Sequence, residues 1–179
     1  MSKLLDLANR SLERKSKEEI LQADITLHCN SFIFYPPFFE RANDLPDLKW
    51  NRIEFKQENR AELPKLKGVY AFAIEINQGN LPPATMILYI GKAGDIGSDN
   101  SLWRRYYDYL RTERIYDRPR IGEMLNRWKG HLSYYYAAVD DSISTGDVEE
   151  TLLDILIPPY NRGDFSPELT SLLKGANIL

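Results

Sequence analysis

The sequence predicts an α+β protein in which a small antiparallel three-stranded β-sheet is flanked by helices. Three stretches combine alternating polarity with β-branched and aromatic residues, which is typical of strands. Three other stretches repeat apolar residues at helical spacing. Their order along the chain is β-β-α-α-β-α. The strands are expected at residues 68–76, 85–91 and 132–139, and the helices at 102–112, 119–128 and 146–156.

The first two strands are expected to pair as an antiparallel hairpin. The strand GVYAFAIEI is followed by NQGNLPPA, a connection rich in turn-forming residues, and then by TMILYIG. Because side chains alternate between the two faces of a strand, Tyr70, Phe72 and Ile74 should share one face.

Each expected helix has a start or stop signal. Ser101 suits the N-cap of the first helix, and Pro119 suits the first turn of the second. Pro158 and Pro159 should end the third helix, since proline cannot continue its hydrogen-bond ladder. The apolar stripes expected to face the core are Leu102, Tyr106, Tyr109 and Leu110, then Ile121, Met124, Leu125 and Trp128, then Val148, Leu152, Leu153 and Leu156.

The chain is expected to comprise an N-terminal accessory region, residues 1–60, and one main domain, residues 61–179. Within the accessory region, residues 3–22 suggest an amphipathic helix and residues 24–35 have a β-rich composition. The C-terminal stretch FSPELTSLLKG is expected to add a short helix.

Composition excludes several classes of protein. The 179 residues include one cysteine and two histidines, too few for a disulfide framework or a Cys/His zinc site. No apolar run reaches the roughly 20 residues of a membrane span, and the N-terminus is too charged for a signal peptide. We therefore expect a cytoplasmic protein with neither a membrane nor a disulfide-linked partner.

Charge is distributed unevenly along the chain. The net charge is −3, which by itself argues mildly against a nucleic-acid partner. Residues 102–131, however, contain eight Lys or Arg against four acidic residues. Such a segment is either a solvated helix face or a phosphate-binding surface.

A set of short motifs falls at the ends of the expected elements. They are GVY at 68–70, YIGK at 89–92, LWRRYYDY at 102–109 and VEETLLDILIPPYN at 148–161. In this order and on these elements, the set resembles the GIY-YIG nuclease superfamily, and the resemblance covers about residues 66–163. It implies a metal-dependent endodeoxyribonuclease, a hydrolase that cleaves phosphodiester bonds in DNA.

The resemblance assigns roles to residues of this chain. Glu149 would hold Mg²⁺ or Mn²⁺, Arg105 would bind the phosphate, and Tyr70 would activate the attacking water. Tyr89 and Tyr109 would position that water or bind the phosphate. The spacing of the family motif implies Arg105 rather than Arg104 and Glu149 rather than Glu150, with Arg104 as a further contact to DNA. Helical geometry agrees for Glu149, which shares a flank with Leu152 and Leu153. Asn161 is expected to support the site by bonding to backbone.

The residues themselves suggest how the site would work. Gly91, without a side chain, would let a DNA backbone approach the end of its strand, and Lys92 would add a positive charge there. A phenol with a pKa near 10 is a poor base at neutral pH. Lys92 and Arg105 are therefore expected to lower the pKa of the tyrosines.

Several functions remain open on the sequence. The compact arrangement resembles the restriction endonucleases of the superfamily, which implies restriction or defence and allows a homodimer. Structure-specific or repair cleavage is the second interpretation. The alternative of another class is a catalytically silent nucleic-acid-binding module on the same fold. A protein-binding role for the 11 tyrosines is a further hypothesis.

Overall fold

A computed structural model describes residues 16–96, 98, 100–111 and 118–179. The chain divides into two compact units, Met1–Ser31 and Phe32–Leu179. Within the described residues no helix is long and apolar enough to cross a bilayer. Part of the basic segment, residues 112–117, lies outside the description, as do residues 3–15 of the expected N-terminal helix.

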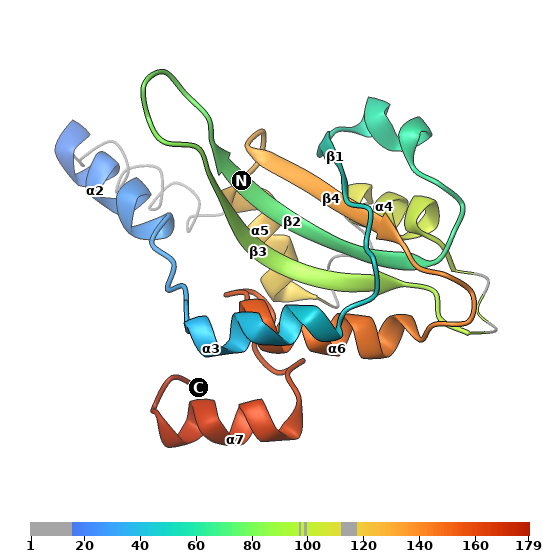
Figure 1. The fold of residues 1–179 in the computed structure, drawn as a ribbon. Helices are drawn as coiled ribbons and strands as arrows, with labels where there is room; N and C mark the ends of the chain where they lie inside the picture. Colours follow the sequence, from blue (N-terminus) through green and yellow to red (C-terminus); the bar gives the residue numbers. More distant parts are fainter. Residues whose placement is uncertain (1–15, 97, 99, 112–117) are drawn as a thin grey trace, which may run out of the picture. The chain divides into compact units, whose positions relative to one another are not determined.

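The first unit contains helix α2, Lys17–Leu27 (Figure 1). It begins with a capping box, because the Ser16 hydroxyl accepts a hydrogen bond from the Glu19 amide and the Glu19 carboxylate accepts one from the Ser16 amide. The β-rich composition of residues 24–35, which suggested a possible strand, does not correspond to one. Residues 24–27 complete this helix, and no strand is present over 28–35. The segment of β-rich composition is not paired with any strand of the described residues.

The second unit is built on a four-stranded sheet in which every pair is antiparallel. Its order is β1-β4-β2-β3 (Figure 1). The expected sheet of three strands is therefore corrected to four. The additional strand falls within residues 1–60, is only four residues long and buries only Ile53. The strands are β1 Asn51–Glu54, β2 Gly68–Ile76, β3 Ala84–Ala93 and β4 Leu132–Ala138.

The helices of this unit follow the expected signals. The Ser101 hydroxyl accepts from the Arg104 amide as the N-cap of α4, and Pro119 stands at the start of α5. Helix α6 ends at Leu156, just before the two prolines, with Ile157 in the left-handed conformation. The helices are α3 Pro36–Phe39, α4 Leu102–Leu110, α5 Pro119–Arg127, α6 Thr145–Leu156 and α7 Pro167–Gly175, with 3₁₀ turns at Glu40–Asp44 and Gln57–Glu62.

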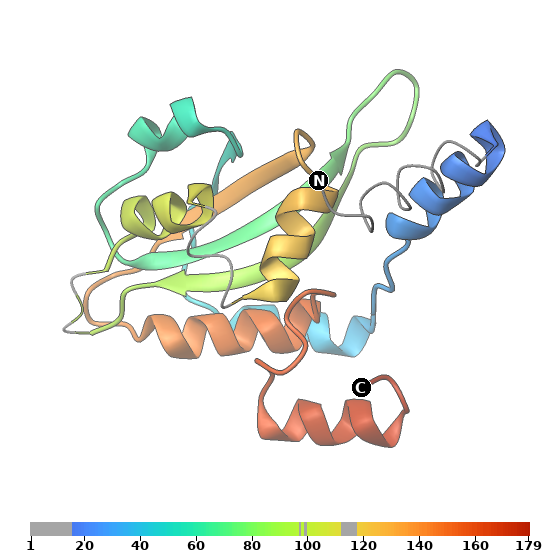
Figure 2. The same ribbon diagram turned by 180° about the vertical axis from the view of Figure 1, so that it is seen from behind.

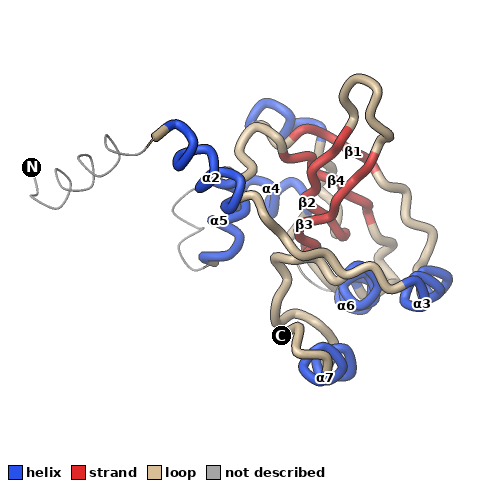
Figure 3. The backbone as a smooth tube through the Cα atoms, turned by 90° about the vertical axis from the view of Figure 1, so that its left-hand side faces the viewer, coloured by secondary structure: helices blue, strands red, loops and turns tan. Residues whose placement is uncertain are grey.

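Two apolar clusters cover the two faces of the sheet. On one face α4 and α5 pack over an aromatic cluster in which Tyr70, Tyr106 and Tyr134 are fully buried (Figure 2). On the other face α6 packs over Val69, Ala71 and their neighbours, and α3 lies beside α6 (Figure 3). Leu169 and Leu173 of α7 belong to the same apolar cluster. The expected stripes are buried, except that Leu110, Trp128 and Leu156 are only half-buried.

A polar network joins the edge strand β1 to the centre of the sheet. The Arg52 guanidinium donates two hydrogen bonds to the Glu75 carboxylate, of 3.0 and 2.7 Å, across the intervening strand β4. The Tyr135 hydroxyl donates to the same carboxylate, and Arg52 also reaches the Ser133 hydroxyl. The hydrogen bonds from Arg52 lower the pKa of Glu75 below its usual value.

This network predicts an acid-sensitive contribution to stability. Because the folded-state pKa of Glu75 is lowered, its contribution is present above the unfolded-state pKa and is lost as the pH falls through the folded-state value. Arg52 is partly exposed, so we expect Glu75→Gln to reduce the free energy of unfolding by only about 0.5–1 kcal/mol at pH 7. The difference should disappear toward pH 3.

Urea unfolding of wild type and variant at several pH values measures this difference. Glu58→Gln removes an exposed carboxylate outside the network and serves as the control, with little effect at either pH. A Glu75→Gln effect that is the same at pH 7 and pH 3 would show that the carboxylate charge does not stabilise the sheet.

Candidate functional site

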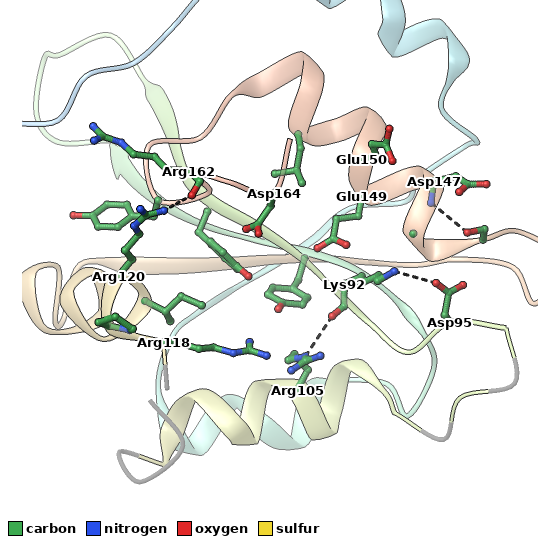
Figure 4. Close-up of a pocket in the computed structure, with 18 residues that line it drawn as sticks. Lys92, Asp95, Arg105, Arg118, Arg120, Asp147, Glu149, Glu150, Arg162 and Asp164 are labelled. Atoms are coloured by element: carbon green, nitrogen blue, oxygen red, sulfur yellow. Dashed lines mark hydrogen bonds and ion pairs between the residues drawn. The ribbon is translucent and has the colours of Figure 1, made fainter. Parts of the chain in front are cut away.

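An open cleft of about 1060 Å³ lies on β3 between the helices α4, α5 and α6 (Figure 4). It carries charges of both signs. The cations come mainly from β3, α4 and the start of α5, whereas most of the carboxylates come from α6 and from the segment that follows it. The charged lining residues are Lys92, Arg105, Arg118, Arg120, Arg162, Asp95, Asp147, Glu149, Glu150 and Asp164.

The structure brings most of the predicted site residues together in this cleft. Tyr70, Tyr89, Lys92, Arg105 and Glu149 all line it, although they come from two strands and two helices. Residues on different elements, separated by 13 to 79 positions in the chain, are thus brought together by the sheet and the two helices that flank it.

Two predicted residues lie beneath the cleft rather than on its surface. The Tyr109 hydroxyl is 2.5 Å from that of Tyr70, and both rings are almost completely buried. Asn161, 1% exposed, bonds to the backbone of β3. Its expected supporting role agrees with this geometry.

Arg104 does not line the cleft. It is exposed on α4 and borders a separate hollow, together with Lys65, Lys67 and Trp103. Only Asp95 belongs to both hollows. The structure therefore separates Arg104 from Arg105, as expected for adjacent residues pointing about 100° apart on a helix.

A bulge in β3 determines where Tyr89 points. Phe72 of β2 is opposite Tyr89, but the next residue, Ala73, is opposite Ile87, so Leu88 is an extra residue in β3. Simple alternation would place Tyr89 and Ile87 on one face. Instead Tyr89 belongs to the aromatic cluster and Ile87 packs on the opposite face. The bulge thus turns the Tyr89 phenol toward Tyr70.

Gly91 makes room for a tyrosine. It pairs with Tyr70 across the hairpin, and a Cβ atom built on Gly91 would lie 2.3 Å from the Tyr70 hydroxyl oxygen. The missing side chain is thus needed for the packing of Tyr70, and the approach of a nucleic-acid backbone to this glycine stays a prediction. The space that the missing side chain leaves is filled by the phenol ring of Tyr70.

Burial decides the ionisation of the three phenols. Desolvation raises the pKa of Tyr70 well above its ordinary value and also raises the pKa values of Tyr89 and Tyr109. Arg105 acts in the expected direction on Tyr70 and Tyr109, but its effect is smaller than that of burial. The expectation of lowered pKa values is wrong, and all three side chains are neutral phenols at neutral pH.

Arg105 is held at the floor of the cleft. Its Nε donates a 3.3 Å hydrogen bond to the carbonyl oxygen of Lys92, which ties α4 to the end of β3. The Lys92 ammonium in turn pairs with Asp95 at 3.1 Å, beside the first turn of α6 at Gly146. This hydrogen bond from Lys92 and one from the Ile96 amide lower the pKa of Asp95 to about 2.

Glu149 projects into the cleft from the opposite wall. Burial raises the pKa of its carboxyl group, and the charge of Asp164 raises it further, whereas Lys92 and Arg105 lower it. Figure 4 shows Glu149 and Asp164 pointing into the cleft from two different segments. Glu150 is exposed and points away from the centre.

Sequence reasoning missed several cleft residues. Arg118 and Arg120 were counted in the basic segment but were not predicted to be part of a site. Tyr160, Arg162 and Asp164 carried no motif signal beyond their position around Asn161. Among the described residues, no group of three or more His, Cys, Asp or Glu side chains is placed to hold a metal ion.

The packing of Tyr70 on Gly91 gives a stability prediction. In Gly91→Ala the new methyl group would meet the buried Tyr70 ring, which would have to shift within the packed aromatic cluster. We expect a loss of about 1–3 kcal/mol in the free energy of unfolding, measured in urea. Gly175→Ala is the control, because nothing lies within 4 Å of its added Cβ. Equal unfolding midpoints for the two variants would contradict the packing described.

Comparison of the chain with protein-family models, with curated proteins and with solved structures gave no match. The arguments for a function therefore come from the motifs of this chain and from the geometry of its cleft.

Proposed function

We propose that this chain is a divalent-metal-dependent endonuclease that hydrolyses phosphodiester bonds of DNA, on a GIY-YIG-like fold. One observation carries the proposal. Tyr70, Tyr89, Lys92, Arg105 and Glu149, selected from sequence motifs alone, line the same cleft. Residues that matched these motifs only by chance would not be expected to line a single cleft.

The two walls of the cleft carry opposite charges. One wall suits the phosphate anion and the other suits a metal cation. The arginine side, with Arg105 and Arg118, suits phosphate oxygens because a guanidinium presents a forked, permanent charge. The carboxylate side, with Glu149 and Asp164, suits a cation. A phosphodiester group between the two walls would have its negative charge neutralised by the arginines. A cation held by the carboxylates would approach its leaving oxygen from the other side.

The donor set fits Mg²⁺ or Mn²⁺. Glu149 and Asp164 offer only oxygen ligands, which hard cations prefer, and Mg²⁺ often takes one or two carboxylates and keeps several waters. Glu149 would hold the ion, and Asp164 lies near enough for its charge to act on Glu149. A bound ion there would neutralise charge on the phosphate and stabilise the leaving oxygen.

The tyrosines act as neutral groups in this proposal. Tyr70 and Tyr109 share a hydrogen bond, and Tyr89 lies beside them at the cleft surface. As neutral phenols they donate or accept hydrogen bonds and so orient a water or a phosphate oxygen. Base catalysis by a phenolate is not part of the proposal.

The finer assignments follow from the same resemblance. A restriction or defence nuclease acting in the cytoplasm, alone or as a homodimer, is the first interpretation, and repair cleavage is the second. Substrate choice would come from residues 1–60, from the basic segment or from a partner chain.

A second candidate function is supported by the state of the phenols. Because burial raises all three pKa values, none of these three tyrosines is poised as a base. A module that binds nucleic acid through the arginine wall without cutting it would have no need of one. This alternative differs from the nuclease in predicting retarded DNA migration without nicking.

Plasmid cleavage tests the choice between the two functions. With Mg²⁺ or Mn²⁺, wild type should nick or linearise the plasmid, and EDTA should stop it. Glu149→Gln should reduce the rate roughly 100-fold or more, because it removes the charge that holds the ion. Glu150→Gln is the matched control on the same helix and should cleave at nearly the wild-type rate. Cleavage that survives both EDTA and Glu149→Gln would end the nuclease proposal.

Two neighbouring arginines on α4 provide another test. Arg105→Ala should abolish cleavage, since this side chain faces the cleft. Arg104→Ala should leave the rate at saturating DNA nearly unchanged and at most weaken DNA binding. Single-turnover rates and gel-shift affinities on one duplex separate the two effects. The reverse result would place the reaction at the other hollow.

A further inference from the structure

Two guanidinium groups extend toward the centre of the cleft. Arg105 comes from α4, and Arg118 stands immediately before α5, so different segments supply them. Figure 4 shows both side chains extending toward the centre of the cleft, below Glu149 and Asp164. The sequence motifs account for Arg105 only.

The two charges act on the same buried phenol. Tyr109 is 5% exposed, and both Arg105 and Arg118 favour its ionised form through their charges. Both guanidinium groups also line the cleft that Tyr70 lines. The Tyr109 hydroxyl is in turn bonded to that of Tyr70. Arg118 and the Tyr70 phenol thus belong to the same cleft.

Neither arginine forms an ion pair with a carboxylate in the described part of the chain. Arg105 uses its Nε for the Lys92 carbonyl. Two like charges directed at one point repel each other, and an anion between them would offset this repulsion by attracting both. Arg120 differs, because it donates to the carbonyl of Arg162 and so joins α5 to the segment after α6.

We propose that Arg118 is a second phosphate-binding residue and that Arg105 and Arg118 together clamp one phosphodiester group beside the Tyr70–Tyr109 pair. The inference deepens the proposed function and rests on it for the identity of the ligand, a nucleic-acid strand. The phosphate would receive the forks of both arginines on one side and face the carboxylate wall on the other.

Binding without cleavage tests the clamp. Fluorescence anisotropy of a labelled 12-base-pair duplex and of its single strand is measured in EDTA at 100 mM KCl, for wild type, Arg105→Gln, Arg118→Gln and the double variant. Each single change should weaken binding roughly tenfold. Because both side chains hold one phosphate, the double variant should lose clearly less than the roughly hundredfold expected for independent contacts.

Two controls separate the clamp from general electrostatics. Arg104→Gln removes one charge outside the cleft and should combine additively with Arg118→Gln. Arg118→Lys keeps the charge but not the fork, and should recover only part of the affinity. Circular dichroism and urea midpoints confirm that each variant is folded, which the exposure of Arg118 favours.

The outcomes are distinct for the two proposals. Coupled effects of Arg105→Gln and Arg118→Gln support the clamp, even if wild type never cuts DNA with Mg²⁺ or Mn²⁺ and the nuclease proposal fails. Additive effects overturn the clamp and place the two arginines on separate phosphates. Unchanged affinity in Arg118→Gln, or no binding of either oligonucleotide by wild type, also overturns it.

Discussion

The side-chain amide of Asn161 is the interaction on which the site depends. Its Oδ1 accepts from the Ile90 amide and its Nδ2 donates to the Ile90 carbonyl, both at 2.8 Å, inside the protein. A side chain thereby takes the place of a neighbouring strand along the outer side of β3. Because Asn161 follows α6 by five residues, this contact fixes the helix that carries Glu149 against the strand that carries Tyr89. Asn161 thus ties the carboxylate wall of the cleft to β3, to which the hydrogen bond from Arg105 to Lys92 ties the arginine wall.

The aromatic cluster gives the cleft its rigidity but limits its chemistry. Tyr70 stacks on Tyr134 with ring centroids 5.3 Å apart and meets the Tyr109 ring edge-on at 5.8 Å. Rings packed this closely keep each hydroxyl at a fixed position. The same packing removes water from the phenols and makes their ionised forms unfavourable. The packing that fixes the positions of the tyrosine hydroxyl groups therefore also prevents a low tyrosine pKa.

Local signals account for what the sequence predicted well. Strand β2, the caps at Ser101 and Pro119, and the buried stripes depend on neighbours within a few residues. The missed features depend on distant partners. Strand β1 exists because β4 offers it an edge, and the extra residue Leu88 is defined only by the pairing of β3 with β2. Among the site residues, the motif members were found, whereas the placement of Arg118 and Asp164 could come only from the folded chain.

The covering of β3 also bears on how two copies could associate. A sheet of order β1-β4-β2-β3 has two outer strands, and either could in principle extend into a neighbouring molecule. At β3 the Tyr160 amide already occupies the Leu88 carbonyl, and Asn161 occupies both groups of Ile90. Continuous sheet extension is thereby blocked beside the cleft, and the short β1 offers little length for it. A second copy that paired with this part of β3 would first have to displace Tyr160 and Asn161.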